Sequence, residues 1–268
     1  MARPETISSA ANPLVKSVRR AIAHGSLTEE GLAVAETFHL LEEALRSDCP
    51  VKVVLAARSV ESAVEAHVRR LAGIRMAVLP DALFQNLAGT VTSQGVIALV
   101  APVSWTLEQL FRGRSLVVVL DGVQDPGNAG AIVRAAEAFG ATGVMFLKGA
   151  ASPFNPKTLR ASAGSLFRLP FVHSLDAELA RTALQQNKLD IYAGVPFRSG
   201  NHVKSLVDAD LTRKCAIVIG SEGQGVSQSL HSGAIDLAVP TVGVESLNAA
   251  MAASVILYEA RRQRSLKP

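Results

Sequence analysis

The sequence predicts an α/β protein of two domains, in which a smaller α/β/α domain precedes a larger one built on a parallel sheet. The chain has 268 residues, of which 49% are hydrophobic and 19% charged, enough to bury two modest cores. Short apolar segments alternate with amphipathic ones along most of the chain, as strands and helices do in α/β folds. A break in this alternation at 101–114 separates a first domain over 1–103, a linker over 104–114 and a second domain over 115–268.

The first domain opens with an amphipathic helix that begins at Asn12-Pro13. Its apolar face carries Leu14, Val15, Val18 and Ile22, and its other face carries the basic residues Lys16, Arg19 and Arg20. The patterns that follow predict a helix, a strand, a helix and two strands, over 36–46, 51–55, 60–71, 75–79 and 95–100 respectively. These elements form a small α/β/α layer.

The second domain restarts with a continuous apolar run at 116–120, typical of a parallel strand covered on both faces. Further strands are predicted at 143–147, 171–172 with its flanks, 189–193 and 216–219, and helices at 129–139 and 177–187. A last helix is predicted from Leu247 to about Arg264, with Ser246 as its cap. Strands alternating with helices indicate a doubly wound parallel sheet.

Composition excludes several classes of protein. No apolar run approaches the roughly 18 residues of a membrane-spanning helix, so we expect no membrane partner. The first residues are polar where a secretory signal would be apolar, which favours the cytoplasm. The two cysteines, Cys49 and Cys215, have no further Cys or His at ligand spacing. We therefore expect neither a disulfide framework nor a metal site.

The chemistry of a parallel sheet lies beyond the carboxyl ends of its strands, and three loops there are unusual. The loop from Asp121 to Gly130 combines acids, turn residues and Asn128 with a helix that carries Arg134. It suits an anion or a hydroxyl, and equally a plain strand-to-helix turn capped by Asn128.

The other two loops follow the predicted strand 216–219 and precede the last helix. In the first, the glycines from Gly220 to Gly225 allow close approach of a ligand to the backbone. Glu222 within this loop can bind a ribose hydroxyl, hold a basic side chain or cap the next helix. The second runs from Val239 to Asn248, and its Ser-Leu-Asn end opens an apolar helix.

Taken together, the segments Asp121 to Arg134, Ile219 to Gly225 and Val239 to Asn248 resemble the three ordered motifs of the SpoU (TrmH-like) branch of the SPOUT RNA methyltransferases. The resemblance covers about 115–262. The first domain resembles the L30e-like substrate-binding domain that often precedes this enzyme, on 12–16, 35–36 and 90–96.

This resemblance implies a SPOUT domain with a deep trefoil knot, which ordinary topology rules argue against. It implies S-adenosylmethionine as cofactor, bound largely by backbone groups. The matching positions are Gly220, Val239 and Leu247, with Ala193 and Gly194. It also implies a homodimer with its active site at the interface, using the alanine-rich last helix.

The implied reaction moves a methyl group to a ribose 2′-hydroxyl. The family gives the activating role to Arg134, helped by Asn128. A guanidinium is a poor base at neutral pH, so we expect Arg134 to bind a phosphate and stabilise developing alkoxide charge. The alternative, in which Arg134 acts as the base beside a second positive group, stays open. In the same picture Glu222 orients Arg134 or the ribose, and Ser246 and Asn248 complete the polar lining.

RNA is the implied partner. Residues 1–105 carry equal numbers of basic and acidic side chains, so the net charge of +4 arises in the remainder of the chain. Phosphate contacts are expected from Arg160 and Arg168, and from the helix face of Lys16, Arg19 and Arg20. Ribosomal RNA is favoured over transfer RNA, because the first domain resembles a ribosomal-protein fold. A silent RNA-binding protein on this scaffold and a small-molecule nucleotide enzyme stay open as alternatives.

Overall fold

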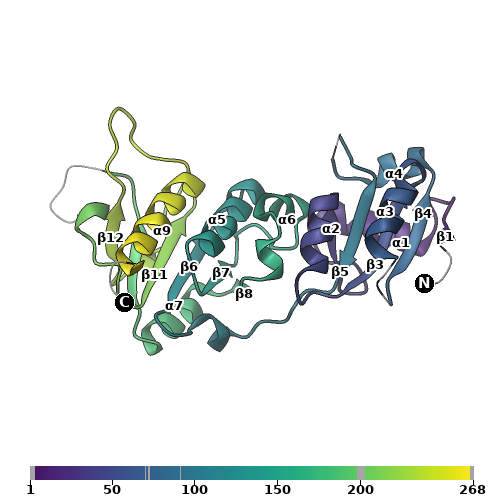
Figure 1. The fold of residues 1–268 in the computed structure, drawn as a ribbon. Coiled ribbons are helices and arrows are strands. Elements are labelled where there is room, and N and C mark those ends of the chain that lie inside the picture. The colour runs from purple at the N-terminus through teal and green to yellow at the C-terminus, as the bar shows by residue number, and fades with distance from the viewer. Residues whose placement is uncertain (1–3, 70, 72, 91, 198–202, 266–268) are drawn as a thin grey trace. The chain divides into compact units, whose positions relative to one another are not determined.

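The computed structural model describes all residues except 1–3, 70, 72, 91, 198–202 and 266–268 (Figure 1). Arg70 of the predicted helix 60–71, and Val91 of the segment that resembles the substrate-binding domain, lie outside the described residues. The chain divides into two units. The first comprises 1–104 together with 154–168, and the second comprises 105–153 together with 169–268. The segment 154–168, although distant in sequence, thus belongs to the first unit.

The sheet of the first unit contains β1 (Glu5–Thr6), β2 (Ala33–Glu36), β3 (Val51–Ala57), β4 (Arg75–Leu79) and β5 (Val96–Val100) in the order β1-β4-β3-β5-β2. β1, β4 and β3 pair in parallel, whereas β5 runs antiparallel to β3 and β2. The predicted helix start at Glu36 is wrong. Glu36 ends β2, whose four residues are all buried, and the Thr37 side chain caps the following helix instead.

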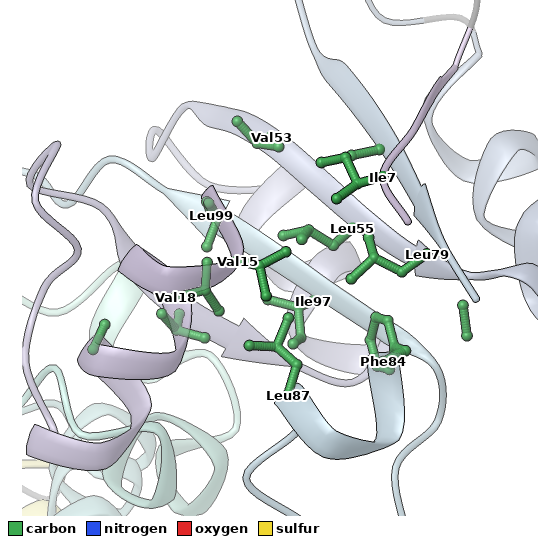
Figure 2. Close-up of a cluster of buried hydrophobic side chains, with 14 residues drawn as sticks. Ile7, Val15, Val18, Val53, Leu55, Leu79, Phe84, Leu87, Ile97 and Leu99 are labelled. Carbon is green, nitrogen blue, oxygen red and sulfur yellow. The ribbon is translucent and has the colours of Figure 1, made fainter. Parts of the chain in front are cut away.

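The helices of this unit are α1 (Pro13–His24), α2 (Phe38–Leu45), α3 (Glu61–Val68), α4 (Asp81–Leu87) and α6 (Pro156–Ser162). α1 begins as predicted, since the Asn12 side chain accepts from the Leu14 amide at 2.9 Å and Pro13 needs no partner for its nitrogen. Figure 2 shows the apolar faces of α1 and α4 directed at the strands. The labelled core residues are Ile7, Val15, Val18, Val53, Leu55, Leu79, Phe84, Leu87, Ile97 and Leu99, all buried.

The second unit contains an all-parallel sheet of seven strands in the order β10-β12-β9-β11-β6-β7-β8. The strands are β6 (Leu116–Asp121), β7 (Gly143–Leu147), β8 (Phe171–Leu175), β9 (Asp190–Gly194), β10 (Lys204–Ser205), β11 (Cys215–Gly220) and β12 (Ile235–Ala238). The five predicted strands of this domain and their parallel pairing are confirmed. β10 and β12 escaped prediction, because they are short and their exposed residues break the apolar pattern.

The helices of the second unit are α5 (Pro126–Ala138), α7 (Ala177–Gln186), α8 (Gln228–His231) and α9 (Ala249–Ser265). α9 lies beside α5 and β11 (Figure 1). The expectation that Ser246 caps this last helix is wrong. Asn248 Oδ1 accepts from the amides of Ala250 and Met251 at 2.9 and 3.3 Å, because the helix begins only at Ala249.

The far end of α9 is fixed by Arg264. Its guanidinium donates to the backbone carbonyls of Arg114, Ser115, Leu211 and Arg213, at the amino ends of β6 and β11. Burial lowers the pKa of Arg264 and raises the pKa of the neighbouring Cys215 thiol to about 11.

Within the described residues, no helix is long and apolar enough to cross a membrane.

Candidate active site

Two hollows open at the carboxyl ends of the strands of the second unit. The β9–β12 hollow, of about 320 Å³, lies beyond β9 and β12 and is lined from Gly194 to Phe197, from Ile219 to Gly223, by Val239 and by Ser246 and Leu247, among others. The β6–β7 hollow, of about 760 Å³, lies beyond β6 and β7 and is lined from Asp121 to Asp125, by Asn128, Lys148 and Gly149, and from Gly220 to Gln228. The segment Gly220–Gly223 borders both.

The positions matched to the cofactor motif gather at the β9–β12 hollow. Gly194, Gly220, Val239 and Leu247 line it, whereas Ala193 is fully buried in β9 and does not. Ser246, expected in the polar lining of the reaction site, is exposed and also lines this hollow. Residues that prediction missed include Pro196, Phe197, Thr241 and Ile256. The first two directly follow β9, so the position beyond that strand would have indicated them.

The loop after β11 is a tight turn. Ser221 and Gly225 exchange backbone hydrogen bonds of 3.0 and 2.9 Å across it. A Cβ at Gly220 would stand 2.2 Å from the Gly225 carbonyl carbon, so no other residue fits there without opening the turn. Gly220 is therefore needed to close the loop. The sequence analysis had explained the glycines of this loop by close approach of a ligand.

Three predicted side chains meet at the β6–β7 hollow. Asn128 Nδ2 donates to Glu222 Oε1 at 2.7 Å, and Asn248 Nδ2 lies 3.1 Å from Asn128 Oδ1 and 3.4 Å from Glu222 Oε1. They come from the start of α5, the loop after β11 and the residue before α9. We refer to them as the Asn–Glu–Asn network. A carboxylate held by two amides is an oriented acceptor for a hydroxyl.

Neighbouring acids hold the backbone around this network. The Asp125 side chain caps α5 by accepting from the backbone N–H of Asn128 at 2.8 Å. The alternative in which Asn128 is the cap is therefore wrong, and the side-chain amide of Asn128 binds Glu222 instead. Asp121, 8% exposed, accepts from the Ser227 amide at 2.6 Å and ties the end of β6 to the loop after β11. Sequence reasoning placed both acids in the loop without giving them these roles.

Arg134 stands apart from both hollows. Its side chain is exposed on α5 and lines neither of them. Among the hydrogen bonds of the described residues, none joins the Arg134 guanidinium to the network.

The basic residues expected to contact RNA lie in the first unit. Lys16, Arg19 and Arg20 are exposed on α1, and Arg20 forms an ion pair with Glu29. Arg160 of α6 forms an ion pair with Glu36, which is only 4% exposed, and Arg168 forms one with Glu43. The RNA contacts of all five stay predictions.

The comparison with family models identifies the catalytic part. Residues 115–258 match the SpoU rRNA Methylase family. The chain belongs to this family. Residues 12–98 match the MRM3-like substrate binding domain, so this SpoU methylase carries a substrate-binding domain before its methylase domain.

Individual relatives are similar to this SpoU methylase over nearly its whole length. An uncharacterized tRNA/rRNA methyltransferase of Synechocystis is 34% identical, covering 97% of this chain and 94% of its own. The 23S rRNA (guanosine(2553)-2′-O)-methyltransferase RlmP of Bacillus subtilis is 32% identical, covering 95% and 98%. The AdoMet-bound rRNA methyltransferase of Sinorhizobium meliloti superposes with a TM-score of 0.80 at 26% identity, covering 96% and 97%. The α/β methyltransferase fold with its preceding substrate-binding domain is thereby confirmed.

Proposed function

We propose that this SpoU methylase transfers a methyl group from S-adenosylmethionine to a ribose 2′-hydroxyl of ribosomal RNA. The observation that carries the proposal is the Asn–Glu–Asn network, which stands beside a hollow lined by four of the five positions matched to the cofactor motif. The relative RlmP, named as a 23S rRNA 2′-O-methyltransferase, supports this chemistry and this substrate. These side chains also disfavour a silent RNA-binding protein.

The β9–β12 hollow fits the cofactor. Ile219, Leu237 and Ile256 give it apolar walls that suit a purine ring, while Gly194 and Gly220 leave backbone groups uncovered by side chains. When bound, S-adenosylmethionine supplies a methyl group already activated by its sulfonium. The protein must then bring the hydroxyl into line for attack, and as the oxygen–methyl bond forms and the methyl–sulfur bond breaks, the hydroxyl proton passes to its hydrogen-bond acceptor.

The network orients the ribose in this mechanism. Glu222 accepts a hydrogen bond from the 2′-hydroxyl, and the amides of Asn128 and Asn248 keep its carboxylate fixed. Arg134 binds the adjacent phosphate and stabilises negative charge as it develops on the attacking oxygen. A guanidinium keeps its proton at neutral pH, so this side chain is unsuited to abstract the hydroxyl proton as a base.

Arg134 reaches the site in a homodimer, the assembly that we propose for this chain, with the knotted topology of the family. Support comes from α9, on which Met251, Val255 and Tyr258 are 59%, 40% and 57% exposed. Their spacing of four and three residues places them on one helical face. A second copy covering this face would bury it and bring a partner's residues toward the hollows.

The dimer is tested by Val255→Glu in the full chain. Sedimentation should show monomers at micromolar concentration, with methyl transfer reduced at least tenfold. Leu179→Glu is the matched control, since Leu179 is an apolar side chain 60% exposed on a different helix, α7. Monomeric wild-type protein with full activity would contradict the proposal.

The first unit selects the RNA, and ribosomal RNA is the proposed substrate class. The match of 12–98 to a substrate-binding domain supports this division of work. A cytoplasmic location accords with such a substrate and with two buried, unpaired cysteines.

The decisive experiment measures transfer of tritiated methyl groups from S-adenosylmethionine to separated ribosomal and transfer RNA. Label should enter ribosomal RNA and survive as a 2′-O-methylnucleoside after digestion. Label found only in transfer RNA would show that transfer RNA is the substrate. If the protein is folded and binds S-adenosylmethionine but labels neither RNA, the proposed function is contradicted.

A further inference from the structure

Lys148 is the basic side chain of the β6–β7 hollow. It directly follows β7, and its side chain is 69% exposed. The other charged residues that line this hollow are the acids Asp121, Asp125 and Glu222. A polyanionic strand that enters the hollow therefore meets three carboxylates and one ammonium.

The carboxylates are already engaged with protein donors. Asp121 accepts from the Ser227 amide, Asp125 from the Asn128 amide, and Glu222 from two asparagine side chains. Each acid thus holds the protein's own groups, and among the described residues that line this hollow Lys148 is the one that offers a positive charge to a phosphate.

The ion pair of Lys148 is loose. Its Nζ lies 3.6 Å from Asp176 Oδ2, beyond the distance of a good hydrogen bond, and both side chains are well exposed. Asp176 has a separate structural role, because its other oxygen caps α7 by accepting from the Glu178 amide at 3.1 Å. Exposed pairs of this kind add little stability, so the ammonium can exchange Asp176 for a stronger anion.

The remaining lining of the hollow suits a nucleotide. Its volume of about 760 Å³ lies within the range of ligand pockets, and the exposed Gln124, Gln224 and Gln228 line it with amides that match base edges. An RNA nucleotide brings a phosphate on either side of its ribose. A lysine acts on such a group as a point charge and carries no base preference.

We propose that Lys148 binds a backbone phosphate next to the target ribose and gives up Asp176 to do so. This inference rests on the proposed function, because it takes RNA as the ligand of the hollow. Lys148 is then a positioning residue, which holds the strand while the Asn–Glu–Asn network orients the hydroxyl.

Two substitutions with different expected effects on KM test it in the full-length protein. Lys148→Gln should raise the KM for ribosomal RNA about tenfold, as loss of a charge-assisted contact does, with kcat unchanged. It should also lower the slope of log affinity against log salt by about 1. Asp176→Asn keeps the cap oxygen of α7 but frees the lysine, so KM should fall or stay unchanged.

Lys214→Gln is the matched control, because Lys214 is an exposed lysine next to β11 at the opposite, amino end of the sheet. The inference is overturned if Lys148→Gln changes KM less than twofold. It is equally overturned if Asp176→Asn raises KM as much as Lys148→Gln, since the ion pair itself would then be what matters. Binding of ribosomal RNA, followed by anisotropy, gives the same comparison without turnover. Wild-type protein that binds RNA without methylating it would contradict the proposed function alone.

Discussion

At the scale of residues, the site depends on side chains that are far apart in sequence. Asn128 and Glu222 are separated by 94 residues, and Asn128 and Asn248 by 120, yet each pair lies within hydrogen-bond distance. Parallel strands make this possible, because the loops that follow them meet at one edge of the sheet. Arg134 is the exception, since α5 carries it away from that edge.

Arg134→Ala should lower methyl transfer at least a hundredfold, because the guanidinium acts on phosphate and transition-state charge. S-adenosylmethionine affinity, measured by calorimetry, should stay within a few-fold. Arg134→Lys should fail nearly as badly, since an ammonium lacks the planar fork of donors. Arg181→Ala on α7, outside both hollows, is the control. Near-normal turnover of either Arg134 variant would remove this residue from the mechanism.

Gly220→Ala should weaken S-adenosylmethionine binding at least tenfold, because the added Cβ would stand 2.2 Å from the Gly225 carbonyl carbon and force the turn open. Gly223→Ala in the same loop is the matched control, since a Cβ there meets nothing within 4 Å. Calorimetric titration of both variants checks the difference. Equal affinities would show that closure of this turn is not needed for cofactor binding.

At the scale of elements, α6 is joined to the rest of the first unit by its contacts with β2. Glu36 ends β2 and is 4% exposed, and its carboxylate accepts from the Gly89 amide at 2.7 Å and from Arg160 of α6. A buried carboxylate needs such partners, because removing a charge from water is costly. The segment 154–168 is therefore part of the structure of the first unit as well as a candidate for RNA contact.

Arg160→Ala should lower the free energy of unfolding by about 3 kcal/mol, since it leaves the Glu36 carboxylate buried without its ion partner. Arg58→Ala is the control, because the pair of Arg58 with Glu61 is exposed and should contribute less than about 1 kcal/mol. Urea denaturation followed by circular dichroism measures both. Equal losses of unfolding free energy in the two variants would show that the buried Glu36 carboxylate does not depend on Arg160 for its stabilisation. A loss of RNA affinity without a loss of stability would instead favour direct contact with RNA.

At the scale of the whole molecule, the proposed function divides RNA recognition from methyl transfer between the two units. Both hollows are lined by residues of the second unit alone, and the exposed basic face of α1 lies in the first. Lys16 and Arg19 contribute charge in a region whose acidic and basic residues balance, so their effect on RNA should be local.

The double substitution of Lys16→Gln with Arg19→Gln should weaken binding of ribosomal RNA and lower the salt slope of binding by about 2, because two phosphate contacts are lost. S-adenosylmethionine affinity should be unchanged, since the cofactor hollow lies in the other unit. Filter binding across a salt series checks the slope. A slope equal to that of wild-type protein would place RNA recognition on another surface.

The main strands, the parallel sheet of the second unit and the three loops of the candidate site could be predicted from the amino-acid sequence. Continuous apolar runs and motif spacing are local properties, so they can be found without coordinates. Local signals were weaker for β2, β10 and β12. β2 was not predicted, and a helix was expected to start at its last residue, Glu36, because four consecutive buried residues show no alternation. β10 and β12 have two and four residues, too few to show a pattern.

The side chains that meet in the folded chain could be identified only from the three-dimensional structure. It showed that Asp125 and Asn248 cap their helices, and that Asn128 is thereby free to bind Glu222. It assigned 154–168 to the first unit and buried Glu36 against Arg160. Hydrogen bonds and ion pairs between distant segments depend on how strands are ordered in a sheet, and residue spacing along the chain does not encode that order.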